Sequence, residues 1–189
     1  MNLSPIDPNR LGLDATNIDA QGITLVNPEP IITHINARFR FPSDLFDDLA
    51  FFQVSHKIIR AASLPIQIPQ KPTADRIGID FLRIDMANPR MTTSAAMTWG
   101  RHATSNAIDT TSEQCELFLG RKPFELTTSQ HHRCTGRGFV LIRYLGYALG
   151  VGFLESTRRD DENFGRVRSM YPRAYSTEVQ QTSPLGNPS

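Results

Sequence analysis

The side chains of this sequence that could carry chemistry lie mainly between positions 115 and 173. His131, His132 and Cys134 place two imidazoles beside a thiol, and such groups ligate zinc, with His102 or Cys115 as candidate further ligands. The spacing matches no standard zinc finger, and adjacent histidines in an extended segment point to opposite faces. A Cys134–histidine nucleophile pair lacks an evident third group to orient it. We therefore predict a polar turn here, with no metal site and no catalytic residue.

Basic and aromatic side chains in the same region indicate a different chemistry. The planar guanidinium of arginine can donate two hydrogen bonds to one phosphate. Gly136 and Gly138 flank Arg137 and would let backbone N–H groups approach a phosphate closely. The alternative is a solvated charged face, because the acidic run 160–162 neutralises part of it. The candidates for contacting phosphates or stacking on unpaired bases are Arg121, Lys122, Arg133, Arg137, Arg143, Tyr144, Arg166, Arg168, Tyr171 and Arg173.

A second candidate surface precedes position 102. Thr92, Thr93 and Ser94 stand at the start of an expected helix, with Arg90 and Arg101 nearby. A helix N-terminus with hydroxyl groups can bind a phosphate. Ordinary helix capping explains the same hydroxyls, and we prefer that interpretation.

A hairpin must position the candidate arginines. The runs Phe139–Tyr144 and Ala148–Leu154 have the composition of strands, and the short turn at Leu145-Gly146 joins them. Gly150 and Gly152 interrupt the second run, which predicts a bulge, a barrel corner or a close backbone approach. These devices are typical of a small β-barrel.

Short elements are predicted before this hairpin, without the regular βαβ alternation of a doubly wound sheet. Thr111 or Ser112 should cap one helix, and Gly120 should end it in a left-handed conformation. The expected elements are a strand at Ile77–Met86, a helix from Ala95 to about Ala103, a short strand at Asn106–Asp109 and a helix at Glu113–Leu119.

The N-terminal part predicts a strand followed by a helix. Ile31–Phe41 alternates, and Leu45–Ala62 carries apolar residues, several of them phenylalanines, at helical spacing. Met1–Pro30 is expected to form an irregular arm with one short strand, and Leu64–Pro72 to form a proline-rich linker or edge strand.

Composition limits the classes of protein that fit. The 189 residues can bury one core or a domain with a smaller subdomain, and a net charge of +1 means that nucleic-acid affinity must come from a local patch. Two cysteines are too few for a disulfide framework, and no apolar run reaches the length of a membrane span. We expect a cytoplasmic protein with reduced thiols and no membrane partner.

The hairpin and its flanks resemble a known family. The run GFVLIRYLGYALGVG, followed by a charged loop and VRSMYPR, resembles the PUA-like RNA-binding domain at the C-terminus of bacterial rRNA cytosine-5 methyltransferases of the Sun/Fmu type. In that family a short helix with a Leu-x-Gly-like end precedes the hairpin, and Leu119-Gly120 matches it. The resemblance extends from about Glu113 to Arg173 and implies an RNA-binding module. The family's catalytic cysteine follows a proline, whereas neither Cys115 nor Cys134 does, and no glycine-rich cofactor loop is present.

These observations lead to one expected organisation. The fold class is α+β, a small mixed PUA-like β-barrel decorated with short helices (76–175), with an N-terminal strand-helix extension (1–75) and a flexible tail (176–189). The expected function is that of a stand-alone, non-enzymatic RNA-binding protein without a cofactor, which recognises structured rRNA or tRNA in RNA modification or ribosome assembly. An RNA-modifying enzyme is a second candidate partner, and DNA is not expected. The alternatives are a protein-interaction subunit that docks through the helix 45–62, and a small His/Cys-dependent or zinc enzyme.

Overall fold

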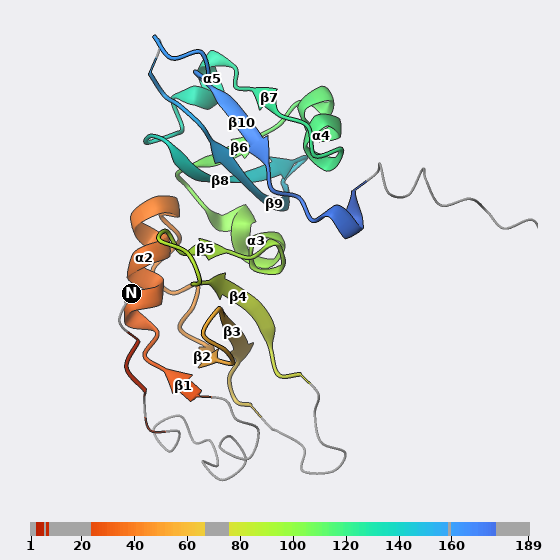
Figure 1. The fold of residues 1–189 in the computed structure, drawn as a ribbon. Helices are drawn as coiled ribbons and strands as arrows, with labels where there is room; N and C mark the ends of the chain where they lie inside the picture. Colours follow the sequence, from red (N-terminus) through yellow and green to blue (C-terminus); the bar gives the residue numbers. More distant parts are fainter. Residues whose placement is uncertain (1–2, 6, 8–23, 67–75, 159, 177–189) are drawn as a thin grey trace, which may run out of the picture. The chain divides into compact units, whose positions relative to one another are not determined.

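The computed structural model describes residues 3–5, 7, 24–66, 76–158 and 160–176 (Figure 1). The chain divides into two compact units, Met1–Ala95 and Ala96–Ser189. The fold is α+β, with two five-stranded sheets and a few short helices, as the sequence predicts. The predicted arm (1–30), linker (64–72) and tail (176–189) lie largely outside the described residues. No helix within the described ranges combines the length and hydropathy needed to cross a bilayer.

The described part of the first unit contains an antiparallel sheet and the helix α2. Its strands lie in the order β1-β2-β3-β4-β5, so that each pairs with its sequence neighbour. The elements are β1 (Thr24–Val26), α2 (Glu29–Phe39), β2 (Leu49–Gln53), β3 (Ile58–Ser63), β4 (Ile79–Arg83) and β5 (Arg90–Met91). β4 lies within the predicted strand Ile77–Met86, which is thereby confirmed.

The strand predicted for Ile31–Phe41 is wrong, because most of this segment forms α2. Its buried residues Ile31, Ile35 and Phe39 recur every four positions and therefore share one helical face. Pro30 lies in the first turn, where its missing N–H costs no intrahelical hydrogen bond. Phe39 and Phe41 alternate with polar residues and so suggested a strand. The four-residue spacing of the buried side chains instead matches the helix that forms.

The helix predicted for Leu45–Ala62 is also wrong, because β2 and β3 form an antiparallel hairpin there. Ala50, Phe51 and Phe52 are all buried, so both faces of β2 are covered and its sequence shows no clean alternation. The Phe51 ring packs edge to face on Phe81, with centroids 4.9 Å apart. A partner-docking helix with a Phe-rich face therefore has no structural basis in this segment.

The boundary between the two units lies between Ala95 and Ala96, whereas the sequence predicts a boundary at 75/76. The difference follows from strand pairing. β4 pairs with β3, and β5 pairs with β4 through Leu82 and Met91, so both strands extend the first sheet. Local composition does not show which sheet a short strand joins.

The second unit contains a curled, half-barrel sheet with the order β6-β8-β9-β10-β7 (Figure 1). β6 runs parallel to β8, and the other neighbours are antiparallel. Its strands are β6 (Ala107–Asp109), β7 (Phe124–Glu125), β8 (Gly138–Tyr144), β9 (Tyr147–Leu154) and β10 (Arg166–Ser169). The helical segments after β5 are α3 (Thr93–Trp99), η2 (Gly100–His102), α4 (Ser112–Leu119), α5 (Thr128–His131) and η3 (Arg173–Tyr175). The core consists of Ile108, Phe118, Phe124, Val140, Ile142, Leu154 and Val167.

The predicted hairpin is confirmed as β8 and β9. Leu145 and Gly146 have φ values of 50° and 82°, as in the two-residue turns that match the twist of paired strands. Gly150 has a φ of 150° and follows Leu149, the extra residue of β9 at the register shift between Ile142 and Arg143, so it lies at a bulge. A Cβ atom on Gly152 would lie 2.8 Å from Cγ1 of Val167, so this glycine permits the close approach that the sequence predicts.

Two capping boxes fix the short helices α4 and α5. Thr111 caps α4 and Thr127 caps α5, and in each case the glutamine three residues later accepts a hydrogen bond from the cap's backbone N–H. The two glutamines, Gln114 and Gln130, are buried and donate hydrogen bonds to each other at 3.0 and 2.7 Å. The Thr111 cap confirms one of the two predicted positions, and the reciprocal pair joins both helix starts.

Candidate functional site

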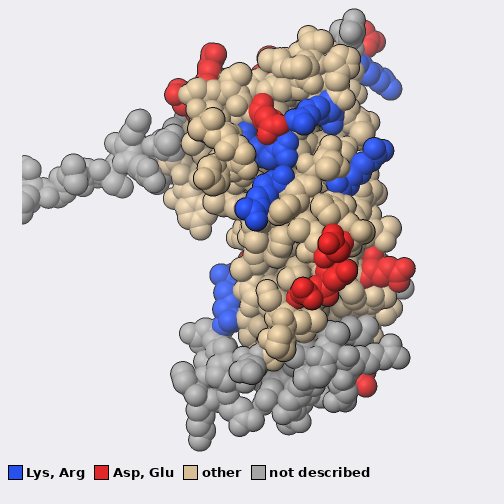
Figure 2. All heavy atoms as spheres, turned by 180° about the vertical axis from the view of Figure 1, so that it is seen from behind, with Lys and Arg blue, Asp and Glu red and all other residues tan. Residues whose placement is uncertain are grey.

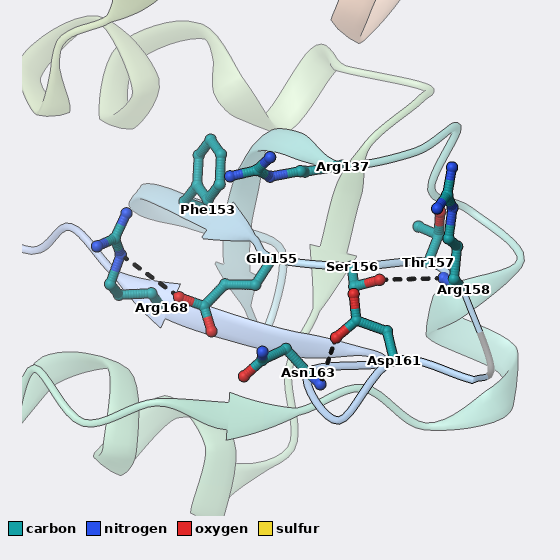
Figure 3. Close-up of a pocket in the computed structure, with 9 residues that line it drawn as sticks. All are labelled: Arg137, Phe153, Glu155, Ser156, Thr157, Arg158, Asp161, Asn163 and Arg168. Carbon is teal, nitrogen blue, oxygen red and sulfur yellow. Dashed lines mark hydrogen bonds and ion pairs between the residues drawn. The ribbon is translucent and has the colours of Figure 1, made fainter.

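The main candidate site is a polar groove of about 700 Å³ in the second unit (Figure 3). β9 and β10 form one side of it, and the loop between these strands forms the other. We call it the arginine groove, and it is lined by Arg137, Phe153, Glu155, Ser156, Thr157, Arg158, Asp161, Asn163 and Arg168.

Phe153 lies at the centre of a row of side chains on neighbouring strands. It pairs with Phe139 of β8 and with Arg168 of β10. The rings of Phe139 and Phe153 meet edge to face at 5.3 Å. The guanidinium carbons of Arg137 and Arg168 each lie 5.6 Å from the Phe153 ring centroid, within cation–π range. Figure 3 shows the Phe153 ring between the two arginines, so one ring holds two exposed cations at the groove.

Glu155 holds the neighbouring arginines loosely. Its carboxylate oxygens lie 3.6 Å from Nε of Arg166 and 3.8 Å from Nε of Arg168. These distances exceed those of a good hydrogen bond, and exposed ion pairs of this kind contribute about 0–1 kcal/mol. Both guanidiniums can therefore exchange Glu155 for another anion at little cost.

The acidic loop of the groove is ordered by its own hydrogen bonds. The backbone N–H of Asn163 donates to Oδ1 of Asp161 at 2.8 Å, and this bond, followed by one from the Ser156 hydroxyl, holds the pKa of Asp161 below its ordinary value. The backbone N–H of Arg158 donates to the Ser156 hydroxyl at 3.2 Å. The loop thus holds Arg158 at the end of the groove away from Phe153 (Figure 3).

Arg143 and Arg133 lie elsewhere, on Asp109. Arg143 donates from Nε and Nη2 to the two carboxylate oxygens, both at 2.9 Å, and from Nη1 to the carbonyls of Arg101 and Ala103. Its side chain is only 11% exposed, and Arg133 also donates to the same carboxylate. Burial opposes ionisation of Asp109, but the hydrogen bonds and charges of Arg143 and Arg133 outweigh it and keep the pKa of Asp109 below its ordinary value. The structure therefore ties Arg143 into the fold rather than presenting it to a ligand.

The remaining predicted side chains do not gather at one place. The Tyr171 ring packs on Phe118 of the core at 5.5 Å. Tyr144 pairs with Tyr147 at the exposed hairpin end, and Arg173 begins η3. Of the ten predicted residues, the arginine groove brings together Arg137 and Arg168, with Arg166 held beside them by Glu155.

Arg121 and Lys122 follow α4 and are exposed. The predicted left-handed cap at Gly120 is wrong, because Gly120 has a φ of −77°. The next residue, Arg121, takes the positive value of 59° instead. The chain therefore turns one residue later than glycine's preference suggests.

The histidine–cysteine run packs into the fold in separate directions. The His131 ring stacks on Phe164 with centroids 4.5 Å apart, and His132 is exposed at the end of α5. The Cys134 thiol donates to the Gln130 carbonyl at 3.7 Å. Within the described ranges, no group of three or more His, Cys, Asp or Glu side chains is arranged to hold a metal ion.

The second predicted surface is a capped helix start. The Thr92 hydroxyl accepts a hydrogen bond from the Ala95 N–H at 3.2 Å and donates to the Asp80 carbonyl. The preferred capping interpretation is confirmed for Thr92. The arginine groove therefore remains the main candidate.

Sequence reasoning missed Phe153 and Glu155. Phe153 stands in a strand that the sequence predicts, but its role depends on the partners that flank it on β8 and β10. A usable signal was present in the pattern F-L-E, because Phe153 and Glu155 stand on either side of the core residue Leu154 and so share the opposite face.

Figure 2 shows basic side chains gathered over one face of the second unit, with acidic side chains among them.

Comparison with known proteins gives no assignment: no protein-family model matches this chain, and no curated protein matches it.

Proposed function

We propose that this protein binds RNA through the arginine groove. The observation that carries the proposal is the pair of exposed guanidiniums, Arg137 and Arg168, placed 5.6 Å from the same Phe153 ring in an open groove. Guanidiniums donate bidentate hydrogen bonds to phosphates, and an aromatic ring beside them offers a stacking face. The combination of phosphate donors with an aromatic side chain suits a single-stranded or unpaired segment.

A PUA-like fold is part of this proposal. The curled sheet, its glycine-bulged hairpin and the following run from Val167 to Arg173 support it, because these elements carry the sequence resemblance. Structured rRNA or tRNA is the proposed ligand class, with an RNA-modifying enzyme as a candidate partner and the cytoplasm as the proposed location. The proposal includes no catalytic step.

Fluorescence anisotropy with a structured RNA hairpin, repeated over a series of salt concentrations, tests the proposal. We expect affinity to fall steeply with salt for the wild-type protein. Arg137→Ala/Arg168→Ala should weaken binding and flatten the slope by about one to two units. Lys122→Ala/Arg173→Ala removes two exposed cations of the same unit outside the groove and is the matched control. Equal slopes for the two double variants would refute the groove as the RNA site.

A further inference from the structure

A second pocket adjoins the arginine groove in the same unit. It has a volume of about 460 Å³ and is lined by Leu126, Thr128, His131, His132, Thr157 and Phe164; we call it the aromatic pocket. Thr157 lines both the groove and this pocket. The groove and the pocket therefore share one lining residue, which makes them neighbours on the surface of the second unit.

The aromatic pocket differs chemically from the groove. The ring centroids of His131 and Phe164 lie 4.5 Å apart, and the two rings are tilted by 31° relative to each other. Leu126 adds apolar surface, and two threonines add hydroxyl groups. Among the described residues, the lining contains no arginine, lysine or carboxylate side chain. These walls suit a planar, uncharged ligand with a polar edge better than they suit a phosphate.

His131 also has an unused hydrogen-bonding atom. Its Nε2 is buried and has no hydrogen-bond partner among the described residues. Leaving a buried polar nitrogen unpaired is unfavourable, and native structures rarely do so without a reason.

We propose that the aromatic pocket binds the base of an unpaired nucleotide whose phosphate lies in the arginine groove. The inference rests on the proposed RNA binding and adds that one base leaves the RNA stack and enters the protein. The base stacks beside the His131–Phe164 pair, and the hydroxyl groups of Thr128 and Thr157 are available to its polar edge. Proteins read unpaired RNA by this combination of stacking and edge hydrogen bonds.

Oligonucleotides with and without bases separate the pocket from the groove. The affinities of hexauridine, hexacytidine and hexaadenosine are compared with that of an abasic hexamer of the same backbone. We expect the wild-type protein to prefer at least one base-containing hexamer by about tenfold or more. Phe164→Leu and His131→Ala should lose most of this preference and keep the salt slope. Tyr147→Leu removes an exposed aromatic ring that lines neither the groove nor the pocket, so it should keep the preference and serve as the matched control.

A 2-aminopurine hexamer provides a measurement on the unaltered protein. Insertion of this fluorescent base beside aromatic rings should quench its emission, and an unchanged emission at saturation would overturn the inference. The inference is also overturned if wild-type protein binds the abasic hexamer as tightly as the others, or if both pocket variants keep the full preference. If these results occur and Arg137→Ala/Arg168→Ala still flattens the salt slope, the proposed RNA binding is retained and only the pocket inference fails. Failure of every RNA to bind would overturn both proposals.

Discussion

At the residue scale, the candidate site is defined by how each arginine is partnered. Arg137 and Arg168 face an aromatic ring in an open groove, and the contacts of Glu155 with Arg166 and Arg168 are long. The guanidinium of Arg143 instead donates hydrogen bonds to Asp109 and to two backbone carbonyls, and its side chain is nearly buried. Residue type alone is therefore a poor guide to phosphate binding, and partner geometry decides the role.

Glu155→Gln is expected to raise RNA affinity at low salt by roughly three- to tenfold. The carboxylate competes with phosphate for Arg166 and Arg168, and its removal also removes one negative charge from the groove. Folding stability should change little, because these exposed pairs are weak. Anisotropy at low salt measures the effect, and Glu116→Gln, an exposed acid of α4 outside the groove, is the control. An unchanged or lower affinity for Glu155→Gln would contradict the competition.

Asp109→Asn is expected to lower the free energy of unfolding at pH 7 by about 1 kcal/mol, a modest value because solvent screens this half-exposed carboxylate. The pKa of Asp109 is lower in the folded than in the unfolded state, so unfolding takes up protons in the acidic range. The stabilisation is therefore complete above the unfolded pKa and is lost as the pH falls through the folded pKa.

Urea unfolding of both proteins between pH 7 and pH 2.5 measures this dependence. The difference between wild-type and Asp109→Asn protein should shrink as the pH falls. A difference that stays constant with pH would show that the ion pairs of Asp109 with Arg143 and Arg133 do not account for it.

At the element scale, the β8–β9 hairpin sets the geometry of the groove. The turn at Leu145-Gly146 places Tyr144 opposite Tyr147, and continuing that register would set Phe139 opposite Gly152. The bulge before Gly150 shifts the pairing by one residue, so that Phe139 meets Phe153 instead. The bulge therefore puts the two phenylalanines opposite each other at the groove.

Gly152→Ala is expected to destabilise the second unit by roughly 1–3 kcal/mol. The new Cβ atom would lie 2.8 Å from Cγ1 of Val167 and 3.3 Å from Cδ1 of Ile142. Both side chains are fully buried in the core, so the added methyl group would push β9 away from β10. Chemical denaturation measures the loss. Gly152→Ala/Val167→Ala relieves the clash, so its loss should be smaller than the sum of the two single losses; strict additivity would argue against the contact as the cause.

At the scale of the whole molecule, each of the two units contains a five-stranded sheet and a cluster of buried apolar residues of its own. Every described residue that lines the arginine groove or the aromatic pocket belongs to Ala96–Ser189. The described part of the candidate site therefore lies in the second unit.

A fragment of residues 96–189 is expected to fold cooperatively and to bind the RNA hairpin with the salt slope of the full chain. Thermal unfolding followed by circular dichroism tests the folding, and anisotropy tests the binding, with the full chain as the reference. A folded fragment with a much flatter slope would show that cations of the first unit contribute phosphate contacts. A fragment without a cooperative transition would contradict the division into independent units.

The sequence by itself determined the elements whose signals are local. The β8–β9 hairpin, its two-residue turn, the special positions of Gly150 and Gly152 and the Thr111 cap follow from residue types within a few positions of one another. Conformational preference acts at that range, so these predictions required no knowledge of the remaining chain.

Only the tertiary structure decided the rest. Residues 31–41 and 45–62 exchanged their predicted states, because burial on the first sheet outweighed a weak local pattern. Because β4 pairs with β3, the boundary between the units lies at 95/96 instead of the predicted 75/76. A one-residue shift in register places Phe153 opposite Phe139, and Phe153 is the ring that Arg137 and Arg168 share. These outcomes depend on which distant strands pair and in which register. That is set by the free energy of packing the whole sheet, and no short stretch of sequence contains it.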